Sequence, residues 1–315
     1  MDDAEVLVIA YGFEYALMAV NLARSIGASN PGLARAVITN DDRVRTLLEQ
    51  EFERVVVRDE SADRNRTIKT AAIDFAIARR NVLVDADAEV VGDLAPALRL
   101  LDRFDVLLKM NASPLNKPFD LDPDIPSTVF PQYSSGVVFF RRSAPAERFF
   151  ATWAAEFAAL GLDRDQPALA RTVLRCPEVP ILVLNAIWNA NPADLRSGLF
   201  RPEREQPRID SFMDPASAPA IAGRLARTLE EILPALPASL REESEVRRVV
   251  EKYRLLGHPA ARWPMTRRIL FAVRSRARRL TGRGPVDIWD RGSVSIGERY
   301  SGGRGGAGGA SPSSP

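Results

Sequence analysis

Residues 81–94, NVLVDADAEVVGDL, place four carboxylates within and directly after a run that otherwise has the composition of a buried strand. The apolar part ends at Asp85, and Asp87 follows the small residue Ala86. In open parallel sheets, ligands bind outside the carboxyl ends of the strands. Two carboxylates at such an end repel each other unless a cation lies beside both, and a hard divalent cation prefers oxygen ligands. The stretch therefore predicts a Mg²⁺ or Mn²⁺ site that would also bridge the phosphates of a nucleotide. Turn and cap chemistry is the alternative.

Three other pairs of aspartates have the same spacing, within residues 120–124 and at residues 163 and 165. The first two lie in a proline-rich segment, where solvated turn carboxylates are the simpler interpretation. A β-type apolar run directly precedes Asp85 and Asp87, and this position makes them the predicted metal ligands.

The chain alternates short β-type runs with helical patterns, which is typical of a doubly wound α/β domain. Continuous Val, Ile and Leu runs indicate a mostly parallel sheet that is covered on both faces. The β-type runs occupy residues 5–11, 35–39, 54–57, 81–84, 105–110, 133–140 and 181–184. Helical patterns occupy residues 15–26, 67–80 and 146–160, and further helices are expected to begin near residues 41 and 165.

The composition divides the chain into three predicted parts. Residues 1–222 form the α/β domain, with a Rossmann-like mixed sheet, and residues 223–283 form a basic helical extension. Residues 284–315 are expected to be a disordered tail, because Gly, Ser and Pro dominate its end.

The formal net charge of +2 is unevenly distributed. From Arg262 onward, eleven arginines accompany three acidic residues, a balance of +8, so residues 1–261 carry −6. A mildly acidic body with a basic end is not typical of a nucleic-acid-binding protein. The single cysteine, Cys176, excludes an internal disulfide and fits a reducing compartment. The start has no signal-peptide pattern and no apolar run reaches about 20 residues, so we expect a cytoplasmic protein.

Residues 262–282, RWPMTRRILFAVRSRARRLTG, contain seven arginines and no acidic residue. On a helix, Ile269, Val273 and Leu280 share one side. This pattern suits a helix lying on the anionic inner face of a membrane, which would make the protein peripheral there. A helix packed on the α/β domain with a solvated basic face is the alternative.

The stretch KTAAIDFAIARRNVLVDADAEVVGDLAPALRLLDRFDVLL resembles the core of nucleotide-diphospho-sugar glycosyltransferases with the GT-A fold. It is similar to glycosyltransferase family 8 and its bacterial relatives. The blocks FPQYSSGVVFFRRS, DRDQPALARTVL and LVLNAIWNAN follow in family order, so the resemblance covers about residues 5–215. It implies a metal-dependent, hexosyltransferase-like enzyme. Such an enzyme moves a sugar from a nucleotide donor, usually UDP-linked, to a glycan, lipid or protein acceptor.

The resemblance assigns the donor site residue by residue. Asp85 and Asp87 would hold Mn²⁺ or Mg²⁺ on the donor diphosphate, and Lys69 would face the donor. Tyr11 or Tyr15, in the turn AYGFEY after the first strand, would cover the base. A surface position for Lys69 and ordinary helix packing for Tyr15 are the alternatives.

The resemblance also assigns the sugar side of the site. Ser134, Ser135 and Gly136 match the strand beside the donor sugar, although the family usually has Asn where Ser134 stands. Asp165 and Gln166 match the pair near the sugar and the acceptor. A capping role for Asp165 is the alternative. In the last block, Trp188 and Asn189 are interpreted as core and turn residues, and a role in the site is the alternative.

The family supplies a histidine as its third metal ligand, and here the sequence departs from the pattern. The one histidine, His258, follows a polar helical pattern rather than a β-type run. The stretch PRIDSFMDP instead places Asp210 at the corresponding position, and Asp is a competent ligand for Mg²⁺ or Mn²⁺. The alternative is that Asp210 is a loop residue and the metal site is weakened.

Two other functions are considered. The haloacid-dehalogenase type of phosphatase is excluded because its motif belongs on a first strand, whereas three strands precede Asp85, and Glu89 stands where its Thr would be. A non-catalytic, degenerate sugar-nucleotide-binding module stays open because of the missing histidine and of Ser134.

Overall fold

The computed structural model describes residues 3–59, 65–111, 131–162, 164–192, 194, 198, 205–212 and 219–257. Residues 1–262 belong to one compact unit. The following account concerns the described residues of this unit.

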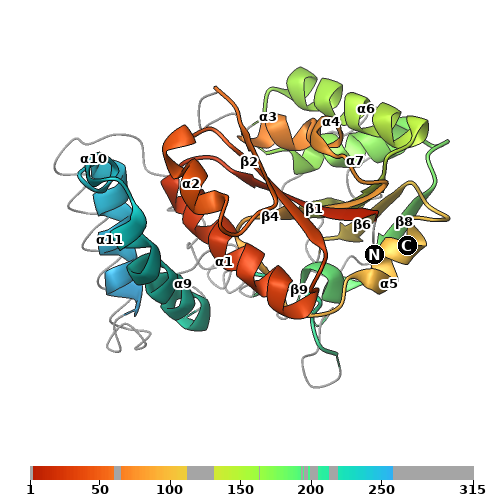
Figure 1. Cartoon of the computed structure of the whole chain (residues 1–315). Coiled ribbons are helices and arrows are strands. Elements are labelled where there is room, and N and C mark those ends of the chain that lie inside the picture. The colour runs from red at the N-terminus through yellow and green to blue at the C-terminus, as the bar shows by residue number, and fades with distance from the viewer. Residues whose placement is uncertain are drawn as a thin grey trace, which may run out of the picture. The chain divides into compact units, whose positions relative to one another are not determined.

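A seven-stranded mixed sheet forms the centre of the unit, with strand order β3-β2-β1-β4-β7-β6-β8 (Figure 1). Its strands are β1 (Ala4–Ala10), β2 (Ala34–Thr39), β3 (Arg54–Val57), β4 (Arg80–Asp85), β6 (Val106–Met110), β7 (Tyr133–Arg141) and β8 (Ile181–Leu184). Strands β1 to β4 of this sheet pair in parallel, whereas β7 runs antiparallel to both β4 and β6. The predicted mixed α/β sheet is therefore confirmed.

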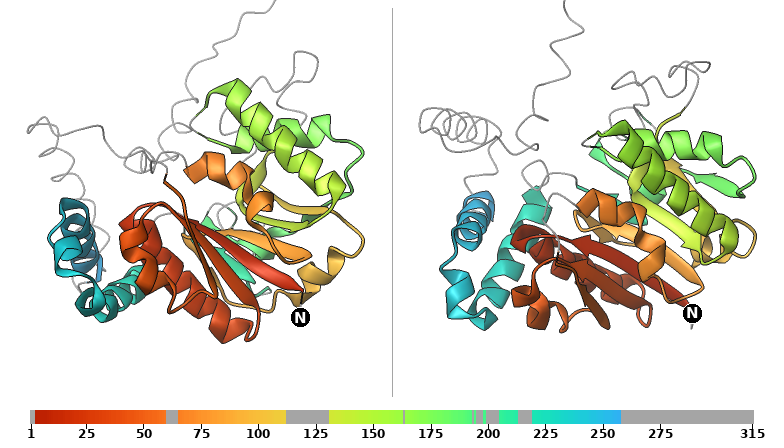
Figure 2. Two further views of the ribbon diagram at one scale, coloured as in Figure 1. Left: turned by 45° about the horizontal axis from the view of Figure 1, so that its top comes forward. Right: turned by 90° about the horizontal axis from the view of Figure 1, so that it is seen from above.

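Alternate side chains of β1 enter two different cores, because successive residues of a strand point to opposite faces. Val6 and Val8 pack on one face, and Leu7 and Ile9 on the other. The first face is covered by α1 (Phe13–Ser29), α5 (Ala95–Leu100), α9 (Pro219–Ile232) and α11 (Ser244–Gly257). The second is covered by α3 (Asn65–Thr70), α4 (Ala72–Phe75), α6 (Ala144–Leu160) and α7 (Gln166–Arg175). The views in Figure 2 show these layers.

A small second sheet joins β5 (Ala88–Val90) to β9 (Ile209–Ser211) in antiparallel pairing. It begins directly after Asp87 and pairs Glu89 with Asp210. The remaining short elements are η1 (Asp42–Val44), α2 (Arg45–Leu48), η3 (Ala186–Asn189), η5 (Leu233–Ala235) and α10 (Ala238–Arg241).

One predicted helix differs from the structure, and the direction of one strand could not be read from its sequence. The helical pattern over residues 67–80 divides into α3 and α4, and the chain becomes irregular before β4. The strand β7 is antiparallel, although its continuous apolar run fits a parallel strand equally well. Residue 222 lies inside α9, whose Ile221, Ala222 and Leu225 join the same core as α1, and the predicted division of the chain into three parts stays a prediction.

The basic segment 262–282 and the tail 284–315 lie outside the described residues, so both expectations stay predictions. None of the helices in the described part of the chain has the length and apolar character that a membrane-spanning helix needs.

Candidate functional site

Asp85 and Asp87 lie at the carboxyl end of β4, the position for which the sequence predicted a metal site. Asp85 is the last residue of the strand and pairs with Ile9 of β1. A two-residue turn brings the chain to Asp87 and then into β5. The Asp85 side chain is 31% exposed, whereas Asp87 is almost completely buried. One carboxylate is therefore partly exposed to solvent, and the other is buried.

The buried carboxyl group of Asp87 is electrostatically strained. Burial, together with the negative charge of Asp85, raises the pKa of Asp87 to about 7, against a smaller opposing effect of Lys69. Removing a carboxylate from water disfavours its charged form, and a like charge nearby does the same. A divalent cation beside both groups would offset each effect.

Lys69, from α3, lies close to both Asp85 and Asp165. Its Nζ atom lies 2.6 Å from Oδ1 of Asp85 and 3.8 Å from Oδ2 of Asp165. Burial acts to lower the pKa of Lys69, but Asp85 and Asp165 outweigh it, so the pKa is raised and the ammonium group stays charged. The Lys69 side chain is only 11% exposed, so its interpretation as a surface residue is wrong.

Asp165 stands at the N-terminus of α7, but its side chain does not cap the helix. Ser135 Oγ donates a hydrogen bond to Asp165 Oδ1 at 3.0 Å, and Trp153 Nε1 donates one to the backbone oxygen of Asp165 at 3.2 Å. The other carboxylate oxygen, Oδ2, forms no hydrogen bond among the described residues. The capping alternative is therefore excluded, and Asp165 presents an unused acceptor beside Lys69. Gln166, half-buried, is the first residue of α7.

The strand β7, which pairs with β4, also contributes to the site. A Cβ atom on Gly136 would lie 3.1 Å from Oδ2 of Asp85 and 3.2 Å from Nδ2 of Asn189. These distances are tighter than ordinary contacts, so the absence of a side chain at Gly136 lets the two polar groups approach each other. Asn189 Nδ2 also donates a hydrogen bond of 2.8 Å to Ser134 Oγ.

The turn after β1 lies at the same end of the sheet. Tyr11 is buried in the core, whereas Tyr15 is half-buried and packs against the α1 core. Gly12 has a φ of 82°, which favours glycine, and its N–H donates to Asn40 Oδ1 at 2.8 Å. The next amide, of Phe13, donates to Glu245 Oε1 at 3.0 Å. A residue of the C-terminal helices thus fixes the turn that was predicted to bind the nucleoside.

Asp210 lies in the middle of β9, and its surroundings differ from those of Asp87. Burial and the charge of Glu89 raise the pKa of Asp210, against an opposing effect of Arg224. Glu89 itself accepts hydrogen bonds from Asn21 Nδ2 and from the Arg224 guanidinium group. Within the described ranges, no three His, Cys, Asp or Glu side chains are grouped so that they could hold a metal ion. His258 lies outside these ranges.

The side chains present fit a divalent cation in part. Asp85 and Asp87 are hard oxygen ligands at one strand end, and burial, together with the charge of Asp85, raises the pKa of Asp87, an effect that a cation would oppose. The remaining ligands of such a cation would have to come from other groups.

Three features of the site region were not predicted. Asn189 was interpreted as a turn residue, and Glu245 lies in a region without any motif. Lys109 and Asp194 form a buried ion pair, with Lys109 Nζ 2.7 Å from both carboxylate oxygens. The signal available for this pair was a lysine inside the apolar run of β6.

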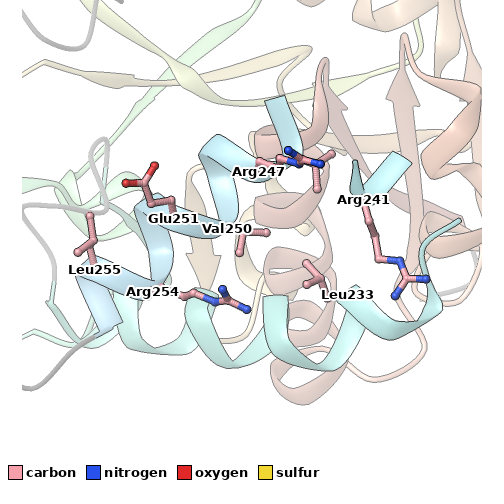
Figure 3. A pocket seen from close by; sticks show the side chains of 8 residues that line it. Leu233, Arg241, Arg247, Val250, Glu251, Arg254 and Leu255 are labelled. Atoms are coloured by element: carbon pink, nitrogen blue, oxygen red, sulfur yellow. The ribbon is translucent and has the colours of Figure 1, made fainter. Parts of the chain in front are cut away.

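A hollow of about 360 Å³ lies on the C-terminal helices (Figure 3). Its lining combines apolar and basic side chains: Leu233, Arg241, Val246, Arg247, Val250, Glu251, Arg254 and Leu255. None of these residues belongs to the acidic site, which is therefore separate from this hollow.

No family model matches the sequence, and no curated protein matches it either. Among solved structures, galactosyltransferase LgtC in complex with donor and acceptor sugar analogs aligns with a TM-score of 0.51 at 13% identity, over 75% of this chain and 99% of that one. The glycosyltransferase GlyE of Streptococcus pneumoniae aligns with a TM-score of 0.51 at 13% identity, over 73% of this chain and 63% of GlyE. The bifunctional glycosyltransferase WbbM gives 0.50 at 14% identity, over 69% of this chain and 47% of WbbM. The predicted GT-A fold is thereby confirmed.

Proposed function

We propose that this GT-A chain is a metal-dependent glycosyltransferase that transfers a hexose from a UDP-linked donor to an acceptor. The observation that carries the proposal is the position of Lys69. Its ammonium group lies between Asp85 of the strand end and Asp165 of α7. Charged groups of both signs thus converge at the edge of the sheet where ligands bind in this class of fold.

In this proposal Asp85 and Asp87 bind Mn²⁺ or Mg²⁺ together with the donor diphosphate. A bound divalent cation would neutralise the negative charge that develops on the departing nucleoside diphosphate. Lys69 adds a fixed positive charge to the same region, and its burial keeps that charge from being screened by water. Binding a dianionic donor in an acidic site therefore needs both the metal and Lys69.

The residues around Asp165 are assigned to the sugar and the acceptor. Ser135 orients the Asp165 carboxylate by its hydrogen bond, and the unused Oδ2 atom is free to accept a hydrogen bond from a substrate hydroxyl. Gln166 follows at the start of α7 and is placed near the same substrate group. Tyr15 is the proposed base-covering residue, because Tyr11 is buried. The LgtC structure holds analogs of both a donor and an acceptor sugar, which supports binding of two sugar substrates.

Asp210 stays the proposed third metal ligand, a role for which it would have to approach Asp85 and Asp87 when the cation binds, because the three carboxyl groups are not grouped in the described structure. An Asp210→Ala variant would then bind Mn²⁺ more weakly, whereas a His258→Ala variant would not. Unchanged Mn²⁺ affinity in both variants would instead support a two-carboxylate site that water and the diphosphate complete, as the absence of a described three-residue group favours.

A second candidate is a non-catalytic module that binds sugar nucleotides. Ser134 in place of the family's Asn is the observation that favours it. Sugar release or transfer measured with bound donor separates the two candidates, because a module would bind the donor and leave it intact.

Attachment to a membrane surface is part of the same proposal. Residues 262–282, with their seven arginines, would hold the protein at an anionic membrane surface, where each arginine contributes about 1 kcal/mol. Co-sedimentation with anionic and neutral liposomes checks this, using the full chain and a variant with Arg274, Arg276, Arg278 and Arg279 changed to Ser. Equal sedimentation of the two proteins with anionic liposomes would exclude the membrane role.

The proposed function is tested first by binding. Thermal unfolding of the full chain is recorded with UDP-, GDP- and CDP-linked hexoses, each with and without Mn²⁺. We expect stabilisation by a UDP-hexose that depends on Mn²⁺, because a ligand that binds only the folded state raises its stability. No shift with any sugar nucleotide would contradict the proposal.

A further inference from the structure

Asn189 has an unsatisfied polar atom in the interior of the protein. The residue ends η3 and is only 2% exposed. Its Nδ2 atom donates to Ser134 Oγ, but its Oδ1 atom accepts no hydrogen bond from the described residues. A buried acceptor without a partner is costly, so each such atom in a native protein calls for an explanation.

The position of the amide group supplies the explanation. A Cβ atom on Gly136 would be close to three polar atoms at once, Asp85 Oδ2, Asn189 Nδ2 and Ser134 Oγ. Asn189 therefore lies beside the carboxylate that is proposed to hold the metal, although 104 residues separate the two in the sequence. A ligand bound at Asp85 would extend past this amide.

Ser134 complements Asn189 chemically. Its Oγ atom accepts hydrogen bonds from Gly136 N at 3.3 Å and from Asn189 Nδ2 at 2.8 Å. A serine hydroxyl has two acceptor lone pairs and one proton to donate, so both lone pairs are used. No described residue accepts the remaining proton. The pair thus offers one acceptor, Asn189 Oδ1, and one donor, the Ser134 O–H.

We propose that Asn189 and Ser134 together recognise a hydroxyl group of the donor sugar. A sugar hydroxyl donates one hydrogen bond and accepts another, which matches the free acceptor and the free donor of this pair. A metal ion would use only the acceptor, and an apolar group would use neither. The inference rests on the proposed function and adds a residue, Asn189, that determines which sugar is bound.

Asn81 provides a matched control. It is also a completely buried asparagine whose Nδ2 donates, to the backbone oxygen of Ala78 at 2.8 Å, and whose Oδ1 has no hydrogen-bond partner among the described residues. It lies near the opposite end of β4, next to Arg80. Substitution of Asn81 thus removes a similar buried amide far along the strand from Asp85.

The test compares the binding of UDP with that of UDP-glucose and UDP-galactose, by titration calorimetry with Mn²⁺ present. In Asn189→Ala we expect affinity for the preferred UDP-hexose to fall about tenfold, the effect of losing a hydrogen bond that the site is built to make. Affinity for UDP should stay within about twofold of the wild-type value, and Asn81→Ala should leave both affinities unchanged.

Ser134→Ala provides a second variant, because alanine fills nearly the same volume as serine. It should also weaken UDP-hexose and spare UDP, and its effect should not add to that of Asn189→Ala if the two residues act on one hydroxyl. Monodeoxy UDP-hexoses identify this hydroxyl: the analog that lacks it should bind equally well to the wild type and to Asn189→Ala.

Three results would be decisive against the inference. Equal losses for UDP and UDP-hexose in Asn189→Ala, or equal behaviour of Asn189→Ala and Asn81→Ala, would contradict the inference and leave the proposed function intact. A wild-type protein that binds neither UDP nor a UDP-hexose would contradict the proposed function and the inference with it.

Discussion

The Nζ atom of Lys69 lies 2.6 Å from Oδ1 of Asp85, which joins the helix α3 to the end of β4. The Lys69 side chain is only 11% exposed and that of Asp85 31%, so their attraction is less screened than that of a fully exposed ion pair. Asp165 approaches the same ammonium group from α7. Lys69 therefore holds three elements of the site together and sets its local charge.

Replacing Lys69 by Ala should lower kcat/KM of transfer by about a hundredfold or more, the size of effect seen when one fixed donor to developing charge is removed. Initial rates over a range of donor concentrations measure this. Arg80→Ala is the control, because it removes a comparably short ion pair of 2.7 Å, with Asp102, at the other end of β4. Equal effects of the two substitutions would show that Lys69 has only a structural role.

Asp87 should make the stability of the metal-free protein depend on pH. Its pKa is raised to about 7 in the folded state, above the ordinary value of 3.8. Between these values the folded protein keeps a proton that the unfolded chain has released, so the free energy of unfolding falls as pH rises from about 4 to about 7. The fall is about 1.4 kcal/mol for each unit by which the pKa is raised.

Urea denaturation in EDTA at several pH values measures this slope. Asp87→Asn cannot ionise, so the fall should be smaller in this variant by the contribution of one carboxyl group. An unchanged slope in Asp87→Asn would mean that Asp87 titrates normally.

Glu245 should connect the C-terminal helices to donor binding. The helix α1 has no side-chain cap of its own at Gly12, and Glu245 accepts the hydrogen bond of Phe13 N instead. Glu245→Ala should cost about 1 kcal/mol of stability, as loss of a helix cap does. It should also raise KM for the donor, because the turn at Gly12 would be less fixed.

Glu245→Gln keeps an oxygen acceptor and should restore most of both losses. Glu243→Ala is the control, since Glu243 pairs with Arg43 at the surface and forms no hydrogen bond or ion pair with α1 in the described structure. If Glu245→Ala left the KM for the donor unchanged, this helix contact would have no influence on donor binding.

Removing one partner of the Lys109–Asp194 ion pair should strongly reduce the stability of the protein. Both side chains are buried, at 1% and 0% exposure, and burial lowers the pKa of Lys109 against the opposing effect of Asp194. Asp194→Ala should cost about 3–5 kcal/mol, because it leaves an uncompensated charge in the interior. Urea denaturation measures this loss.

The double variant Lys109→Met, Asp194→Leu should recover most of that stability, since an apolar pair replaces a buried ion pair with little cost. Arg45→Ala disrupts an exposed pair with Glu49 and should change stability by less than about 1 kcal/mol. Equal losses for Asp194→Ala and Arg45→Ala would show that the buried pair is solvated.

Local sequence patterns predicted the parts of the site that lie on single elements. Asp85 and Asp87 follow an apolar run, and the strand β4 ends there as expected. Asp165 precedes a helical pattern, and α7 begins after it. In each case the information is contained in about ten consecutive residues, over which periodicity is readable.

Contacts between distant segments were not predictable in this way. Asn189 meets Ser134 across 55 residues, and Glu245 meets Phe13 across 232. Both contacts depend on the strand order and on where the C-terminal helices pack, neither of which a local pattern contains. For the same reason the sequence left a cap role open as the alternative for Asp165, whereas its carboxylate accepts a hydrogen bond from Ser135 of the strand β7.

The central claim, that Asp85 and Asp87 hold the metal of a sugar-transfer site, is tested most directly by turnover of Asp87→Asn. Asn keeps the shape of the side chain and removes its charge. The rate of Mn²⁺-dependent sugar release or transfer from the donor is compared between this variant and the wild type, with circular dichroism as the check on folding. The account predicts a loss of at least about a hundredfold with an unchanged spectrum. Wild-type turnover with a normal Mn²⁺ response in Asp87→Asn would contradict it.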